Sequence, residues 1–179
     1  MLRALLMSTL VVSTAAAQTP SLAPFLATPQ DVVERMLRLA GTTSKDVVYD
    51  LGCGDGRIII TAARTFGARG VGVDIDASLI ASAQAAARDA GVERLVTFKV
   101  QDAMTVDVSE ATIVTLYLLA ASNAKLRPAL TRMLRPGARI VAHNFPLGGD
   151  WEPAVIDNFT DANGTLRTLY VWKADGNVH

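Results

Sequence analysis

The chain has 179 residues, and its 17 lysines and arginines balance its 17 aspartates and glutamates. Because nucleic-acid surfaces are built from an excess of basic side chains, this balance argues against a DNA or RNA partner. A single cysteine, Cys53, leaves no internal disulfide, and two histidines provide no cluster of metal ligands. The length suits one domain with a sizeable core.

The first 17 residues have the pattern of a signal peptide. Arg3 supplies a positive charge, residues 4–12 are mostly apolar, and the three alanines at 15–17 match the small residues before a cleavage site. The stretch is too short for a stable membrane span. We therefore predict a signal peptide at residues 1–17 and an exported, periplasmic or secreted protein. The alternative is a frayed apolar N-terminus or a misplaced start codon, and then a cytoplasmic protein.

A linker and an amphipathic helix are expected next. Residues 18–28 contain Pro20 and Pro24, which discourage regular structure, so this stretch is predicted to lead into one domain at residues 29–175. Thr28 can cap a helix that begins near Pro29. In residues 30–40 apolar side chains recur every three or four positions, which indicates one buried helix face, and Gly41 ends the helix.

Residues 47–57, V-V-Y-D-L-G-C-G-D-G-R, are the most informative stretch. Residues 47–51 suit a buried strand, the glycines that follow form a tight turn, and an apolar run from Ile58 continues as a helix. Glycines without a Cβ let a ligand approach the main chain at a helix start. A dinucleotide fingerprint would need glycine at position 57, where Arg57 stands, and no Gly-Lys-Ser or Gly-Lys-Thr follows to form a phosphate-binding loop.

The rest of the domain alternates strands and helices. Strands are predicted at residues 69–74, 96–101, 112–116 and 138–143, and helices at residues 77–90 and 123–134. This alternation predicts an α/β fold, with a mostly parallel sheet and helices on both faces. Near the C-terminus Asn163-Gly164 lies between strand-like segments at 151–159 and 165–173, which predicts a final antiparallel hairpin.

Acidic residues follow three of the predicted strands: Asp50, Asp74 and Asp102. Ligands of open α/β sheets bind beyond the carboxyl ends of the strands, so these carboxylates are expected to share one cleft. An aspartate in this position is by itself more often a turn former or a helix cap. Asp76 is expected to serve as such a cap, for the helix at residues 77–90.

The motif D-x-G-x-G-x-G at residues 50–56 resembles the first motif of the class I methyltransferases that use S-adenosylmethionine, which have a Rossmann-like fold. The resemblance implies that Asp50 and the glycine loop hold the methionine part of the cofactor. It also implies that the acid after the second strand holds the ribose and the acid after the third strand holds the adenine. The cofactor-binding residues expected on this basis are Asp50, Gly52, Gly54, Gly56, Asp74, Ile75, Asp102 and Ala103.

Residues 115–128 and 143–153 resemble a narrower group, the small protein-lysine methyltransferases, which include an archaeal broad-specificity enzyme and the enzyme that modifies ATP synthase subunit c. No Asn-Pro-Pro-Tyr follows the fourth strand, which argues against base amines and glutamine amides as acceptors. Tyr117 is the catalytic candidate, because an aromatic wall lowers the pKa of an amine and its ring face stabilises a sulfonium. Phe145 and Trp151 are further candidates or packing residues, and His143 is a general base or a hydrogen-bonded structural residue.

The predicted function is S-adenosylmethionine-dependent methyl transfer to a protein lysine by in-line attack. Two alternatives stay open. The first is a methyltransferase for a small molecule or a lipid-linked metabolite, which the lack of an insertion to enclose a substrate disfavours. The second is a non-catalytic module that binds the cofactor, which the intact motif disfavours. The sequence does not indicate the oligomeric state.

Overall fold

The computed structural model describes residues 22–23 and 25–179. The predicted signal peptide at residues 1–17 lies outside these residues and stays a prediction. None of the helices in the described part of the chain has the length and hydropathy of a membrane span.

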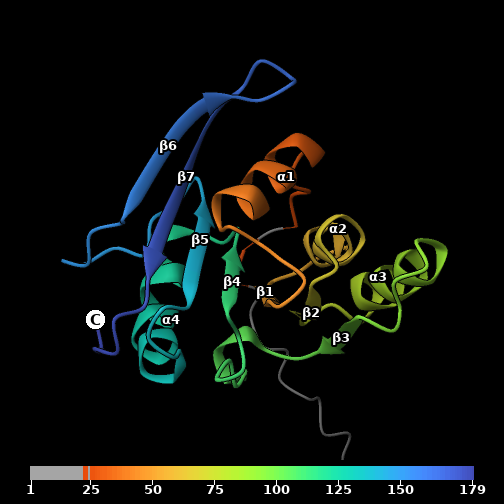
Figure 1. The fold of residues 1–179 in the computed structure, drawn as a ribbon, viewed down its shortest axis with the longest axis horizontal. Helices are drawn as coiled ribbons and strands as arrows, with labels where there is room; N and C mark the ends of the chain where they lie inside the picture. Colours follow the sequence, from red (N-terminus) through yellow and green to blue (C-terminus); the bar gives the residue numbers. More distant parts are fainter. Residues whose placement is uncertain (1–21, 24) are drawn as a thin grey trace, which may run out of the picture.

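One sheet of seven strands forms the centre of the described chain, in the order β3-β2-β1-β4-β5-β7-β6 (Figure 1). Strands β1 to β5 run parallel to one another, and β7 pairs antiparallel with both β5 and β6. This confirms the mostly parallel sheet and the C-terminal hairpin. The strands are β1 Val47–Leu51, β2 Arg69–Asp74, β3 Val96–Val100, β4 Ile113–Leu116, β5 Arg139–His143, β6 Val155–Thr160 and β7 Leu166–Lys173.

Helices cover both faces of the sheet (Figure 1). The buried side chains of α1, α2 and α3 form one core cluster, and those of α4 form a second cluster on the opposite face. Successive side chains of β4 point to opposite faces of the sheet: Ile113 belongs to the first cluster and Val114 to the second. Both faces are therefore apolar, as parallel sheets require. The helices are α1 Gln30–Leu39, α2 Arg57–Phe66, α3 Ala77–Asp89 and α4 Ala120–Met133, with a short 3-10 helix, η1, at Ala103–Thr105.

The predicted cap of the first helix is wrong. Pro29 occupies the N-cap position of α1, and no side chain caps this helix. Because α1 begins at Gln30, Thr28 lies one residue too early for its hydroxyl to reach the free N–H groups of the first turn. Its carbonyl oxygen instead accepts a hydrogen bond of 2.9 Å from Arg57 Nη1.

Two other boundaries differ from the expected ones by three residues or more. Helix α4 begins at Ala120, three residues before its expected start, because the carbonyl of Leu119 already accepts the backbone N–H groups of Ser122 and Asn123. The first strand of the hairpin begins at Val155, later than expected. Pro153 has no N–H for a strand ladder.

Gly56 allows the close packing of α2, so it offers a test of the fold. It is the N-cap of α2 at φ 77°, and a Cβ there would lie 2.6 Å from Phe98 Cε1 and 2.8 Å from Ala83 Cβ. Gly91 has φ 67°, and a Cβ there would meet nothing within 4 Å. We expect Gly91→Ala to lower the free energy of unfolding by about 1–2 kcal/mol through backbone strain. Gly56→Ala should lower it by about 1–3 kcal/mol more through overpacking.

Urea denaturation followed by circular dichroism would measure both losses. Equal losses for the two variants would show that close packing is not the reason for the glycine at position 56.

Candidate functional site

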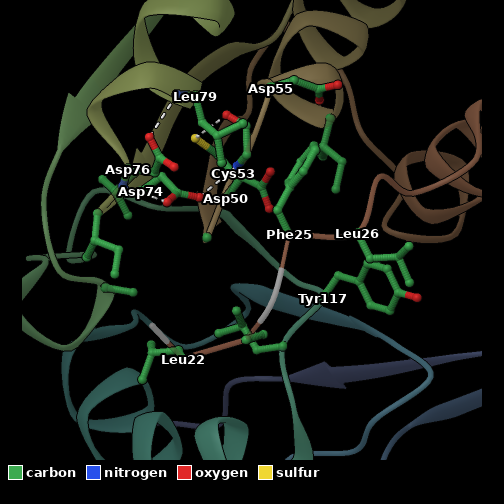
Figure 2. A pocket seen from close by; sticks show the side chains of 18 of the residues that line it. Leu22, Phe25, Leu26, Asp50, Cys53, Asp55, Asp74, Asp76, Leu79 and Tyr117 are labelled. Carbon is green, nitrogen blue, oxygen red and sulfur yellow. Dashed lines mark hydrogen bonds between the residues drawn. The ribbon is translucent and has the colours of Figure 1, made fainter. Parts of the chain in front are cut away.

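A cavity of about 910 Å³ opens at the carboxyl ends of the parallel strands (Figure 2). Strand β1 pairs with β2 on one side and with β4 on the other, so the strand order reverses beside it. Ligands of open α/β sheets bind at such a switch point. The volume lies within the range of about 300–1,000 Å³ that is usual for small-molecule sites.

Most of the site residues expected from the sequence line this cavity. The exception is Gly56, the N-cap of α2, which is packed against Phe98 and Ala83. The expected residues that line the cavity are Asp50, Gly52, Gly54, Asp74, Ile75, Asp102, Ala103 and Tyr117.

Asp50 is a nearly buried acid at the end of β1, with 2% of its surface exposed. It pairs in register with Thr115 of β4, whose hydroxyl donates a hydrogen bond of 2.7 Å to Asp50 Oδ1. The pKa of the Asp50 carboxyl is raised to about 7: burial is the main cause, the nearby charges of Asp74 and Asp55 add to it, and the Thr115 hydrogen bond opposes it. The carboxyl is therefore poised between its two protonation states near neutral pH.

Asp74 connects the end of β2 to the glycine loop after β1. Its Oδ2 accepts the backbone N–H of Gly54 at 3.0 Å, and its Oδ1 accepts that of Asp76 at 3.0 Å. Asp76 accepts from the N–H groups of Ser78 and Leu79, which confirms its predicted role as the cap of α3. The side chain of Asp74 is thus held beside the cavity by the main chain of two elements.

Asp102 caps a helix and also lines the cavity. Its Oδ1 accepts the backbone N–H of Met104 at 2.9 Å and so caps η1. The residue also lines the cavity, together with Ala103. The role of a cap and a position in the site therefore do not exclude one another.

The segment before α1 also lines the cavity, which the sequence reasoning missed. Leu22, Phe25 and Leu26 contribute to the wall, and Figure 2 shows the last two on the side of Tyr117. Ser122 of α4 donates a hydrogen bond of 2.6 Å to the carbonyl of Leu22. Arg57, whose Nε donates to Asp55 at 2.9 Å, holds the carbonyl of Thr28. The sequence signal that could have indicated this part of the wall is the set of apolar residues between the prolines at 20, 24 and 29.

The ring of Phe25 lies directly over the glycine loop. A Cβ at position 54 would clash with this ring, and Gly54 also has φ 53°. The loop is thus bare main chain covered by an aromatic side chain.

Tyr117 and His143 stack on one another where β4 and β5 end. Their ring centroids are 4.0 Å apart, with an angle of 30° between the planes. His143 is fully buried, and neither ring nitrogen has a hydrogen-bond partner among the described residues. The pKa of the imidazole is lowered to about 4: burial is the main cause, the charge of Arg167 adds to it, and the charge of Asp161 opposes it. The ring is therefore neutral at physiological pH.

The other aromatic candidates do not reach the described cavity wall. Trp151 stacks on His179, with ring centroids 4.4 Å apart, and its carbonyl accepts the indole N–H of Trp172. The carbonyl of Phe145 accepts a hydrogen bond from Asn123 Nδ2 at 2.8 Å. For Trp151 the packing interpretation is the one that the structure supports.

Comparison with known proteins gives consistent matches. The family model of the ANTKMT methyltransferase domain matches residues 50–155. A protein-lysine N-methyltransferase of Saccharolobus islandicus (strain REY15A) is 43% identical over 150 residues, which cover 83% of this chain and 92% of the relative. The adenine nucleotide translocase lysine N-methyltransferase of Mus musculus is 31% identical over 77% of this chain, which spans 60% of the relative's length.

A solved structure is also similar over nearly its whole length. It is the crystal structure of an RNA methyltransferase from Salinibacter ruber in complex with S-adenosyl-L-homocysteine. The identity is 48% and the TM-score 0.79, with coverage of 86% of this chain and 97% of the other.

The raised pKa of Asp50 predicts how the stability of Asp50→Asn depends on pH. The folded carboxyl is protonated below about pH 7, whereas the carboxyl of the unfolded chain is protonated only below about pH 3.9. The contribution of Asp50 to stability is thus complete below the unfolded pKa and is lost as the pH rises to about 7. Asparagine lacks this dependence and can still accept the Thr115 hydroxyl. Relative to the wild type, the variant should gain about 3–4 kcal/mol in free energy of unfolding between about pH 4 and pH 7.

Urea denaturation of both proteins across this pH range measures the difference. Parallel pH profiles would contradict a raised pKa for Asp50.

Proposed function

The chain belongs to the family of ANTKMT methyltransferase domains and is an S-adenosylmethionine-dependent methyltransferase; from this membership we propose that it methylates the side-chain amine of a lysine in a protein. The observation that carries the proposal is the cavity itself, in which acids from three strand ends and the ring of Tyr117 line one space. Its support is the Saccharolobus islandicus relative, which is named a protein-lysine N-methyltransferase and is covered over 92% of its length.

The residues present fit the cofactor. Charged residues that line the cavity comprise five aspartates and one arginine, Arg57, which is paired with Asp55. A negative cavity suits a ligand that carries a sulfonium and an ammonium group. When bound, S-adenosylmethionine supplies a methyl group on a positively charged sulfur.

Each acid is assigned a part of the cofactor in this proposal. Asp50 and the main chain at Gly52 and Gly54 would hold the methionine part, because a buried carboxylate pairs well with an ammonium group. Asp74, with Ile75 beside it, would accept the ribose hydroxyls. Asp102 would accept the amino group of the adenine, with Ala103 next to it.

The wall near Tyr117 suits an amine acceptor. A lysine reacts only as the neutral amine, and contact with apolar surface lowers the pKa of an ammonium group. Leu22, Leu26 and Leu118 supply such surface in the same cavity as Tyr117. The ring of Tyr117 would stabilise a methylated ammonium by cation–π attraction. Tyr117 is therefore the proposed catalytic residue, and it acts by contact and water exclusion.

RNA is the second candidate acceptor, because the similar Salinibacter ruber structure is named an RNA methyltransferase. The charges of this chain favour lysine over RNA. Acids outnumber bases five to one on the cavity wall, and the whole chain carries no net positive charge. A phosphate backbone is repelled by such a wall, whereas a lysine ammonium is attracted to it.

Methyl transfer from radiolabelled S-adenosylmethionine to three acceptor pools tests the proposed function. The pools are a protein extract, the same extract with its lysines acetylated, and total RNA. We expect label in the untreated protein alone, because acetylation removes the nucleophilic amine. Acid hydrolysis should then recover the label as methyl-lysine. Label in RNA, or only in small molecules of the extract, would overturn lysine as the acceptor.

The cofactor assignment predicts that Asp74→Ala weakens binding of S-adenosylmethionine. The variant removes the acceptor for the ribose and the bond that holds the Gly54 N–H. A hydrogen bond to a charged group is worth about 1.5–3 kcal/mol, so calorimetry should show a loss of affinity of about 10-fold to 100-fold.

Asp107→Ala is the matched control. Asp107 also accepts a backbone N–H, that of Ser109 at 2.9 Å, but it lies outside the set of cavity-lining residues. Similar losses in the two variants would show that Asp74 acts only on the fold.

A further inference from the structure

We propose that His143 is the positioning residue for Tyr117: its buried ring supports one face of the tyrosine ring and so fixes the orientation of the ring at the cavity. This inference rests on the proposed function, because it assumes that Tyr117 acts on the methyl acceptor. It assigns a use to a buried histidine that packing alone does not explain.

The sheet brings the two rings together by its register. Leu116 of β4 pairs with Ala142 of β5 in a parallel ladder, so Tyr117 and His143, the next residues, lie side by side. Side chains alternate between the two faces of a strand. Tyr117 therefore points to the same face as Thr115, and through the pairing of Thr115 with Asp50 to the face of the buried acid.

The backbone after His143 is held firmly. Asn144 has φ 62°, which is unusual for a residue other than glycine. Its N–H donates to the carbonyl of Thr168 at 2.7 Å, and its Oδ1 accepts the N–H of Thr168 at 3.1 Å. On the opposite side His143 pairs with Leu169 of β7, which is fully buried. These contacts fix the end of β5, and with it the base of the imidazole.

The ring nitrogens of His143 form no hydrogen bond within the described chain. Both nitrogens are buried and lack partners. A buried polar atom without a partner lowers stability, so buried histidines are normally hydrogen-bonded. The aromatic contact of the imidazole in the described chain is the stack on Tyr117, which lies against the flat face of the ring.

The neutral state of the ring suits a support rather than a base. Burial and the charge of Arg167 lower the pKa of His143, and the opposite charge of Asp161 does not compensate. Such a weak base cannot take a proton from an ammonium group of ordinary pKa. A neutral ring behind Tyr117 also leaves the tyrosine π-electrons available to a cation on the cavity side, because no second cation competes for them.

Two variants of similar size separate a flat support from other roles. His143→Phe keeps a flat ring without nitrogens, and His143→Leu keeps bulk without a flat face. We expect His143→Leu to reduce kcat about tenfold on the protein extract, with the affinity for S-adenosylmethionine changed less than twofold. His143→Phe should recover kcat to within about threefold of the wild type. Thermal unfolding of each variant would confirm that the protein is folded.

A spectroscopic readout needs neither acceptor nor cofactor. The chain has three tyrosines, so 3-fluorotyrosine labelling gives few fluorine resonances, and Tyr117→Leu assigns the one from position 117. We expect His143→Leu to shift this resonance and to narrow it relative to the wild type, because the tyrosine ring loses its stacked neighbour. His143→Phe should keep it as broad as in the wild type.

Each outcome decides between the interpretations. Equal loss of kcat in His143→Phe and His143→Leu would overturn the support role in favour of the ring nitrogens. A kcat and a fluorine resonance unchanged in His143→Leu would overturn it altogether. Full activity of Tyr117→Leu would instead contradict the role proposed for Tyr117, while the fluorine spectrum would still report whether His143 orders that ring.

Discussion

The site depends on the parallel pairing of β1 with β2 on one side and with β4 on the other. Parallel strands end at the same edge of a sheet, so the residues after these strands are brought together whatever their distance in sequence. Asp50 and Tyr117 are placed in this way, on the same face, by the pairing of Asp50 with Thr115. Asp74 joins them from β2 and accepts a hydrogen bond from the Gly54 N–H in the loop after β1. Sheet, loop and cavity therefore form one structural unit.

The ligand-free fold is destabilised by the burial of an acid, and a bound ligand can offset this effect. Asp50 is almost fully buried and is compensated by one hydroxyl, so its ionised form is unfavourable in the folded chain. Other acids nearby add to the repulsion. A cationic ligand would remove both effects, which means that the same arrangement that weakens the ligand-free fold strengthens binding. Perturbed carboxyl groups of this kind concentrate at functional sites.

The sequence predicted those parts of the structure that depend on local patterns. Apolar alternation and the Asn163-Gly164 turn indicated the strands and the hairpin, and the glycine motif indicated the loop. The contact of Leu22 with Ser122 joins residues 100 positions apart and has no local signature, so the part of the cavity wall before α1 was missed. Gly56 was assigned to the cofactor because it belongs to the motif, yet in the structure the space beside it is filled by Phe98 and Ala83.

The charges of the cavity also bear on the choice of acceptor. Arg57 is the one basic side chain among the residues described as lining the cavity, and its guanidinium is already bound to Asp55 and to the carbonyl of Thr28. The charge of Arg57 is therefore already paired with an acid, which weakens its attraction for a phosphate. The remaining aspartates repel anions but attract an ammonium group, and the apolar wall beside Tyr117 then favours its neutral form. The aspartates thus attract the ammonium group from a distance, and the apolar wall favours its deprotonation on contact. Methylation of an amine requires both.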